Sequence, residues 1–227
     1  MGQPRAIFQD CHSDTVTRLR FNPAGTLLCS GSEDGLVCIL DLSQSTEEDA
    51  LLSIVPVNHC ISKVGFFGTN RVFVCTSTEQ FSLWDVENSV CLQSYGDVRE
   101  RFSDEGRTID YMIDCVYQPN TDELLLFAGS HAGDMVLFQP QPNDLLHRAS
   151  FDKGHTDVVR AIQYLPEDDL ILSAGEDGRV CVWKPSNPTQ TVEEEADYLT
   201  GSNLAKDSVR QRFRYVLNPY YMRTAPQ

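Results

Sequence analysis

The sequence predicts an all-β protein in which one antiparallel sheet motif recurs about four times along the chain. The first supporting observation is self-similarity, because residues 12–41 and 155–184 align with almost no gaps. The second is that each copy contains short apolar runs about ten residues apart, separated by turn residues, which is typical of short strands. The third is an Asp-Gly pair in each copy, at 34–35 and 177–178, where glycine accepts the positive φ of a hairpin turn.

The individual strands follow from this template. Two weaker copies, at about 59–86 and 111–139, fill the middle of the chain, and a fourth strand is expected before each following copy. In the two clear copies we expect strands at residues 16–21, 27–30 and 36–42, and at 158–164, 170–174 and 180–183.

A large apolar residue anchors the third strand of each copy. The spacings between successive anchors are 44, 54 and 45 residues. The long middle interval predicts an inserted loop over residues 97–107. The four anchors are Leu40, Trp84, Phe138 and Trp183.

A period near 44 residues, with Gly-His before the first strand, Asp-Gly in the turn and Trp-Asp in the third strand, resembles the WD-repeat β-propeller family. In that family a histidine, a hydroxyl, an aspartate and an indole hydrogen-bond to one another within a blade. The resemblance implies such a structural tetrad at His155, Ser173, Asp177 and Trp183. In the first copy it implies the same roles for His12, Ser30 and Asp34, with Leu40 in place of the indole. The second copy keeps Trp84 but has Thr-Glu-Gln at the turn, residues 78–80. The third copy has neither the Gly-His nor the Trp-Asp pair.

The expected organisation is four blades followed by a tail. Segments at 47–51, 97–100, 110–113, 175–177 and 183–185 also resemble one particular member of the family. The resemblance further implies a partial, truncated propeller, because seven blades need about 300 residues; the alternative is a four-bladed ring closed by the first strand. The expected divisions are 1–10 as the outer strand of a preceding blade, blades at about 11–55, 56–98, 108–150 and 151–185, and a tail at 186–227 that is either flexible or helical over 202–217.

Composition excludes several classes of protein. Apolar residues make up 41% of the chain, which is enough for a packed core, and the formal net charge of −15 disfavours direct binding to a phosphate backbone. No apolar stretch is long enough for a membrane span and no signal peptide is evident, so we expect a cytoplasmic or nuclear protein. The eight cysteines include no Cys-x-x-Cys pair and are expected to be reduced core thiols, not zinc ligands.

No catalytic residue, metal ligand or cofactor is expected. A catalytic set at His155, Asp177 and Ser173 is the alternative to a structural tetrad, but the same residue types recur at His12, Asp34 and Ser30. A blade-building element should recur, whereas an active site should not. The chain also lacks a phosphate-binding glycine loop and a His-x-x-x-His pair.

The leading functional hypothesis is a non-catalytic scaffold that binds other proteins. The alternatives are an acidic chaperone or escort for a basic nuclear or ribosomal client, motivated by the charge of −15, and a propeller enzyme. In the inserted loop, local ion pairing of Asp97, Arg99 and Glu100 is the alternative to a binding role. The partner-binding candidates are Asp14, Thr15, Thr17, Glu33, Asp157, Val159 and Glu176 on one face, and Asp97, Arg99, Asp110 and Tyr111 in or beside the loop.

Overall fold

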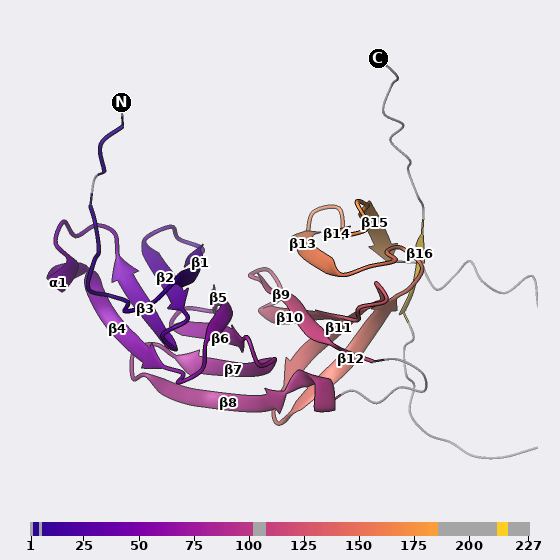
Figure 1. Ribbon diagram of the computed structural model, residues 1–227, viewed down its shortest axis with the longest axis horizontal. Coiled ribbons are helices and arrows are strands. Elements are labelled where there is room, and N and C mark those ends of the chain that lie inside the picture. Colours follow the sequence, from indigo (N-terminus) through magenta and orange to yellow (C-terminus); the bar gives the residue numbers. More distant parts are fainter. Residues whose placement is uncertain (1, 5, 102–107, 186–212, 218–227) are drawn as a thin grey trace, which may run out of the picture.

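The protein is an arc of four β-blades, each with four antiparallel strands, which confirms the predicted all-β, four-bladed architecture. It was studied as a computed structural model that describes residues 2–4, 6–101, 108–185 and 213–217. The sheets follow one another like the blades of a propeller, and the arc is open between the first blade and the last (Figure 1). The first strand of each blade lies on the inner side of the arc, and the fourth lies on the outer side (Figure 1).

Within each blade the strands lie in sequence order, and each pairs antiparallel with the next. Blade 1 comprises β1 (Val16–Phe21), β2 (Leu27–Ser32), β3 (Leu36–Asp41) and β4 (Leu51–Pro56), with the short helix α1 (Glu47–Ala50) before β4. Blade 2 comprises β5 (Ile61–Phe67), β6 (Arg71–Thr76), β7 (Gln80–Asp85) and β8 (Val90–Asp97), followed by the 3-10 turn η1 (Val98–Glu100). Blade 3 comprises β9 (Tyr111–Gln118), β10 (Glu123–Gly129), β11 (Met135–Gln141) and β12 (Asp144–Phe151). Blade 4 comprises β13 (Val159–Leu165), β14 (Leu170–Gly175), β15 (Val180–Pro185) and β16 (Phe213–Leu217).

The turns between the second and third strands use a left-handed residue. Gly35 and Gly178 have φ values of 81° and 73°, as the Asp-Gly pairs predict. Blade 2 places Glu79, with φ of 62°, at the same point of the turn. A side chain with a Cβ atom is disfavoured in this conformation, so Glu79 needs compensating contacts.

The hydrophobic core lies between the blades, because the sheets stack face to face. Each interface buries side chains from two neighbouring sheets. Between blades 3 and 4, the ring centroids of Phe151 and Trp183 are 5.2 Å apart in an edge-on arrangement. Clusters of this kind follow from the alternation of residues along each strand, which sends neighbouring side chains to opposite faces.

Polar contacts also join the blades on the inner side of the arc. The Asp114 carboxylate of β9 accepts hydrogen bonds from Arg18 at 2.7 Å and Arg20 at 3.2 Å, both from β1. These bonds connect blade 1 to blade 3 past the first strand of blade 2. The Thr17 hydroxyl of blade 1 donates to the Ile61 carbonyl of blade 2 at 2.6 Å. This bond joins the two neighbouring blades.

The predicted outer strand near the N-terminus was wrong. Among its described residues, 6–10 form no strand; instead Phe8 and Cys11 pack on the face of blade 1 against Cys38 and Leu40. The alternative, a ring closed by this strand, was also wrong, because the outer neighbour of β15 is β16. Hydrophobic contact with the exposed face of blade 1 explains why this segment does not extend as a free strand.

The predicted helix over 202–217 was wrong where it can be compared. Its last residues form β16, which pairs antiparallel with β15 and parallel with β12. Backbone groups at the edge of β15 need partners, and a strand supplies them where a helix would not. Residues 202–212 lie outside the described part of the chain, as do residues 102–107 of the predicted inserted loop; its described start forms η1.

Candidate binding surface

A buried hydrogen-bond network joins the four tetrad residues of blade 4. The Nε2 atom of His155 lies 2.8 Å from the Ser173 hydroxyl, and its Nδ1 atom lies 3.0 Å from the Asp177 carboxylate. The Trp183 indole donates to the same Ser173 hydroxyl at 2.7 Å. His155, Ser173 and Trp183 are 3%, 2% and 1% exposed, so these groups satisfy one another away from solvent.

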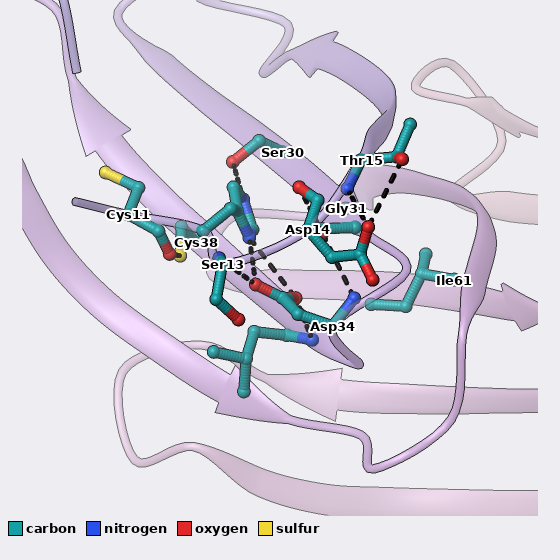
Figure 2. A network of polar contacts seen from close by, with 12 residues as sticks. Cys11, Ser13, Asp14, Thr15, Ser30, Gly31, Asp34, Cys38 and Ile61 are labelled. Atoms are coloured by element: carbon teal, nitrogen blue, oxygen red, sulfur yellow. Dashed lines mark hydrogen bonds and ion pairs between the residues drawn. The ribbon is translucent and has the colours of Figure 1, made fainter. Parts of the chain in front are cut away.

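Blade 1 repeats the network as far as its residues allow. The Nε2 atom of His12 lies 2.7 Å from Ser30, and its Nδ1 atom lies 3.1 Å from Asp34. Leu40 stands where blade 4 has Trp183 and has no group that could donate to Ser30. Figure 2 shows Asp34 on its turn close to Ser13, with Ser30 on the neighbouring strand.

In blade 2 the indole N–H finds its hydrogen-bond acceptor on a different strand. Trp84 donates to Ser82, two residues earlier on the same strand, at 2.8 Å. Val74 pairs with Ser82 and therefore occupies the position that Ser173 has in blade 4, where Ser173 pairs with Cys181. The hydroxyl has moved from the second strand to the third, so Trp84 does not belong to a tetrad.

The two tetrad aspartates are held in their ionised form. Burial opposes ionisation of Asp177, but hydrogen bonds from His155 and from the backbone of Thr156 and Arg179 outweigh it, so the pKa of Asp177 is lowered. Burial likewise opposes ionisation of Asp34, and bonds from Ser13, Leu36 and His12 lower its pKa. These carboxylates are structural acceptors, because all of these donors belong to the blade itself.

Exposed polar residues gather beside the tetrads, on loops that enter the first strands, at the starts of these strands and on turns after the second strands. We call this set the rim surface: Asp14, Thr15, Thr17, Glu33, Asp157, Arg160 and Glu176. Backbone hydrogen bonds fix loop to turn, from Glu33 to Thr15 at 2.9 Å and from Glu176 to Val158 at 2.8 Å. Figure 2 shows Asp14 and Thr15 on the loop next to the Asp34 turn.

Charged groups on the rim surface differ in whether they are already paired. Arg160 forms an ion pair with Glu176, a contact that the sequence analysis missed although Arg160 aligns with the candidate Thr17. The Asp14 carboxylate accepts from the Thr15 backbone at 2.7 Å, and Asp157 accepts from Val158 at 2.7 Å. These short-range bonds orient the two aspartates and leave further lone pairs for a ligand.

The prediction that Val159 binds a partner was wrong. Val159 is 1% exposed and packs in the core between blades 3 and 4. It begins β13, and its side chain faces the neighbouring blade. Val159 therefore offers no side chain to a partner.

The candidates in or beside the inserted loop all bond to other residues of this chain. Arg99 Nε donates to Asp97 at 2.9 Å, and this bond is the largest reason why the pKa of Asp97 is lowered. The Asp110 carboxylate accepts from the His131 backbone at 2.7 Å, and the Tyr111 hydroxyl accepts from the Val159 backbone at 2.7 Å. Asp97 and Arg99 pair with each other, while Asp110 and Tyr111 hold blade 3 to its own turn and to blade 4.

A cleft of about 350 Å³ lies on the opposite edge, between blades 2 and 3. The Arg71 guanidinium sits 4.7 Å from the centre of the Phe67 ring there. No motif in the sequence predicts this cleft, although Pro140 and Pro142 mark the turn at its border. The lining residues are Phe67, Arg71, Leu83, Gln93, Tyr95, Asp122, Glu123, Leu124, Gln139, Pro140, Gln141 and Pro142.

The cysteines are free but not uniformly buried. Cys29, Cys75 and Cys115 are buried, and desolvation raises the pKa of each thiol, to about 12 for Cys29. Cys60 and Cys91 are exposed, so the expectation of core thiols was wrong for these two. Cys60 lies just before β5, and Cys91 lies on β8, the outer strand of blade 2.

Metal binding and membrane crossing both find no support in the described residues. In that part of the chain, no group of three or more histidine, cysteine or acidic side chains is arranged to hold a metal ion. Across the same residues, no helix has the length and hydropathy that a membrane crossing requires.

The fold and the tetrads define a class of protein. A family model described as "WD domain, G-beta repeat" matches residues 2–41 and 147–184, the regions around the two tetrads. A solved structure of the Cps50 (Swd1) β-propeller domain of Myceliophteria thermophila matches with a TM-score of 0.59 and 15% identity, covering 80% of this chain and 57% of that chain. The chain belongs to the WD-repeat family and has the β-propeller fold.

Among particular proteins, the chain is similar to the WD repeat-containing protein 89 homolog of Dictyostelium discoideum. The two are 31% identical over 204 residues, which cover 87% of this chain and 56% of that protein. An uncharacterised WD repeat-containing protein of Saccharomyces cerevisiae is 29% identical over 222 residues, covering 89% and 53%. The chain thus spans about half the length of these relatives. WD repeat-containing protein 89 is also the family member that the segments at 47–51, 97–100, 110–113, 175–177 and 183–185 resemble. That this chain corresponds to the later half of that protein stays a prediction.

Proposed function

We propose that this chain is a non-catalytic scaffold that binds a protein partner through the rim surface. WD-repeat proteins generally act as protein-interaction scaffolds and the family is not generally catalytic, which supports this class of function. One observation favours the rim surface as the place of binding. The tetrad side chains are buried and bond to one another, whereas the polar residues around them are exposed and fixed by backbone bonds.

The proposal gives each part of a blade a separate role. His155, Ser173 and Asp177 hold the loop and the turn in one arrangement, so the residues beside them are preorganised for binding. A preorganised surface loses little conformational freedom when a partner binds.

We propose a cytoplasmic or nuclear location, since eight free thiols suit a reducing compartment.

A basic partner, as for an acidic escort, is the second candidate. The net charge of −15 and the exposed carboxylates of Asp14, Glu33 and Asp157 favour a lysine- or arginine-rich segment. The Glu33 side chain is exposed and has no hydrogen-bond or ion-pair partner among the described residues. Such binding weakens as salt screens the charges.

The scaffold proposal is tested by affinity capture with mass spectrometry, using a rim variant that carries Asp14→Asn, Glu33→Gln and Asp157→Asn. We expect proteins captured by the wild-type chain to be lost from this variant. A matched control carries Glu48→Gln, Glu167→Gln and Asp168→Asn, three exposed positions away from the rim surface. Capture of the same proteins by the rim variant and the wild type would contradict the proposed surface.

A separate measurement tests the basic partner. The probe is a lysine- and arginine-rich peptide, with a neutral peptide of equal length as its control. We expect the affinity of the wild-type chain for the basic peptide to fall at least about tenfold between about 50 and about 300 mM salt. We also expect the rim variant to bind the basic peptide about tenfold more weakly than the matched control variant. Salt-independent binding, or equal affinity for the neutral peptide, would exclude the escort and leave the scaffold proposal intact.

A further inference from the structure

Basic side chains gather on the inner side of the arc, although the chain as a whole has a formal net charge of −15. Arg18 and Arg20 lie on β1, and Lys63 lies on β5. The strands β1, β5 and β9 follow one another along this inner side (Figure 1). We call these three residues the inner basic cluster. It forms a local exception to the acidic character of the protein.

The repeat places charged residues at one level of the inner strands. In blades 1, 2 and 3, the pairing of the first strand with the second shifts register near the start of the first strand. The residue after this shift is Arg18 in blade 1, Lys63 in blade 2 and Asp114 in blade 3. Equivalent positions of successive blades lie at the same height, because the blades repeat one structure. The Cys75 thiol, on the residue that pairs with Lys63, interacts electrostatically with all three, so their charges meet around one point.

Asp114 uses only part of the hydrogen-bonding capacity of the two arginines. One carboxylate oxygen, Oδ2, accepts from Arg18 at 2.7 Å and from Arg20 at 3.2 Å. Each guanidinium has five N–H donors. The Nε atom of Arg18 is buried and has no hydrogen-bond partner among the described residues, which is unfavourable for a buried donor. Arg18 therefore gains from an acceptor that Asp114 does not supply.

Lys63 is the least engaged member of the cluster. Its ammonium group has no hydrogen bond or ion pair with another described residue, and its side chain is partly exposed. Glu79 interacts electrostatically with Lys63, but the Glu79 carboxylate is half-buried and accepts from the Met112 backbone at 2.6 Å. With both Asp114 and Glu79 counted, the site still has more positive groups than negative ones.

We propose that the inner basic cluster binds a single phosphate group, carried by a phosphorylated side chain of a partner or by a small phosphorylated molecule. At neutral pH such a group has a charge of about −1.5 to −2 and three strong acceptor oxygens, so it can accept from all three cations at once. Guanidinium groups match phosphate oxygens in bidentate geometry. Repulsion from the rest of the acidic chain is screened beyond about 8 Å at 0.15 M salt. The cluster shares no residue with the rim surface, so a failure here would leave the scaffold proposal intact.

The first experiment measures binding to the full 227-residue chain by titration calorimetry at neutral pH and about 0.15 M salt. The probes are inorganic phosphate and the capped peptide Gly-phosphoserine-Gly, with Gly-Ser-Gly and Gly-Asp-Gly as controls. We expect the phosphopeptide to bind at least about tenfold more tightly than Gly-Asp-Gly, because a phosphate carries more charge than a carboxylate. We expect no binding of Gly-Ser-Gly.

The two phosphate probes distinguish the possible sources of the phosphate group. Inorganic phosphate that binds as tightly as the phosphopeptide would assign the site to small phosphorylated molecules, and weaker binding would assign it to a phosphorylated side chain. Equal affinity for the phosphopeptide and Gly-Asp-Gly, or no binding of either phosphate probe, would overturn the proposal.

Substitutions test whether the phosphate binds at the cluster. Lys63→Gln and Arg20→Gln should each weaken binding of the tighter phosphate probe about tenfold, since each removes one charge-assisted contact. Lys184→Gln is the matched control, because it removes the same charge at an exposed position on β15, and it should leave the affinity unchanged. Asp114→Asn should strengthen binding, because it removes the anion that competes for both arginines. A purely structural role of Asp114 would not produce that gain.

Circular dichroism establishes which variants are folded. Lys63→Gln breaks no hydrogen bond or ion pair among the described residues, so it decides the matter even where Asp114→Asn does not fold. Lys63→Gln and Arg20→Gln chains that bind the probe as tightly as wild type would overturn the proposal. A folded Asp114→Asn chain that binds the probe more weakly than wild type would also overturn it.

Discussion

At the residue scale, the same tetrad positions are used with different degrees of completeness. Blade 4 has all four groups, blade 1 stops at Ser30, and blade 2 keeps only an indole that bonds to Ser82. A buried polar group that loses its partner costs about 1 to 3 kcal/mol, so each blade must satisfy whichever groups it retains. The replacement of the indole by Leu40 in blade 1 is consistent with this rule, because a leucine leaves no donor unpaired.

The tetrad aspartates make stability depend on pH. A carboxyl group with a lowered pKa in the folded state stabilises the fold above its unfolded pKa of about 4, and this contribution is lost as the pH falls through the folded value. For Asp177→Asn we expect lower stability than wild type at pH 7, with a difference in free energy of unfolding that shrinks below about pH 4. Urea unfolding of both proteins from neutral to acidic pH measures this.

Blade 1 provides the comparison for that measurement. Asp34→Asn should behave in the same direction, because the Asp34 pKa is lowered by the same kinds of bonds. A difference from wild type that stays constant across the acidic range would show that neither carboxylate is linked to folding.

At the element scale, turns and loops are constrained by what lies next to them. Gly133 and Gly178 both occupy the left-handed turn position, with φ of 91° and 73°. A Cβ atom at Gly178 would meet nothing within 4 Å, whereas one at Gly133 would lie 2.6 Å from the carbonyl carbon of His155. The blade 3 turn therefore packs directly on the loop that carries the blade 4 tetrad.

These two glycines allow strain and contact to be separated. For Gly178→Ala we expect a loss of about 1 kcal/mol, because only the backbone conformation is disfavoured. For Gly133→Ala we expect about 3 kcal/mol, because overpacking against His155 is added. Urea unfolding midpoints give both values, and equal losses would show that the close approach to His155 can relax at no cost.

The strands and hairpin turns could be predicted from sequence because their signals are local. Alternating apolar runs and the Asp-Gly pairs identify β2, β3, β14 and β15 without reference to the rest of the chain. The burial of Val159 could not be predicted in the same way, since it depends on which face meets blade 3. The Arg18 and Arg20 bonds to Asp114 join residues that are almost one hundred positions apart, and no local pattern indicates such a contact.

At the scale of the whole molecule, stability comes mainly from contacts between successive blades. Blades 2 and 3 bury both faces, while blades 1 and 4 each have one face with exposed apolar residues. Burial of such residues is the main favourable contribution to folding and association.

The bonds from Arg18 and Arg20 to Asp114 have a consequence for the curvature of the arc. One carboxylate holds two guanidinium groups from a strand two sheets away, so it limits how far the sheets can splay apart. The distance between loops on blade 1 and loops on blade 4 is then governed in part by a single acidic side chain near the axis. The affinity of a ligand that touched both sets of loops would therefore depend on the position of the Asp114 side chain, although the ligand would not contact it.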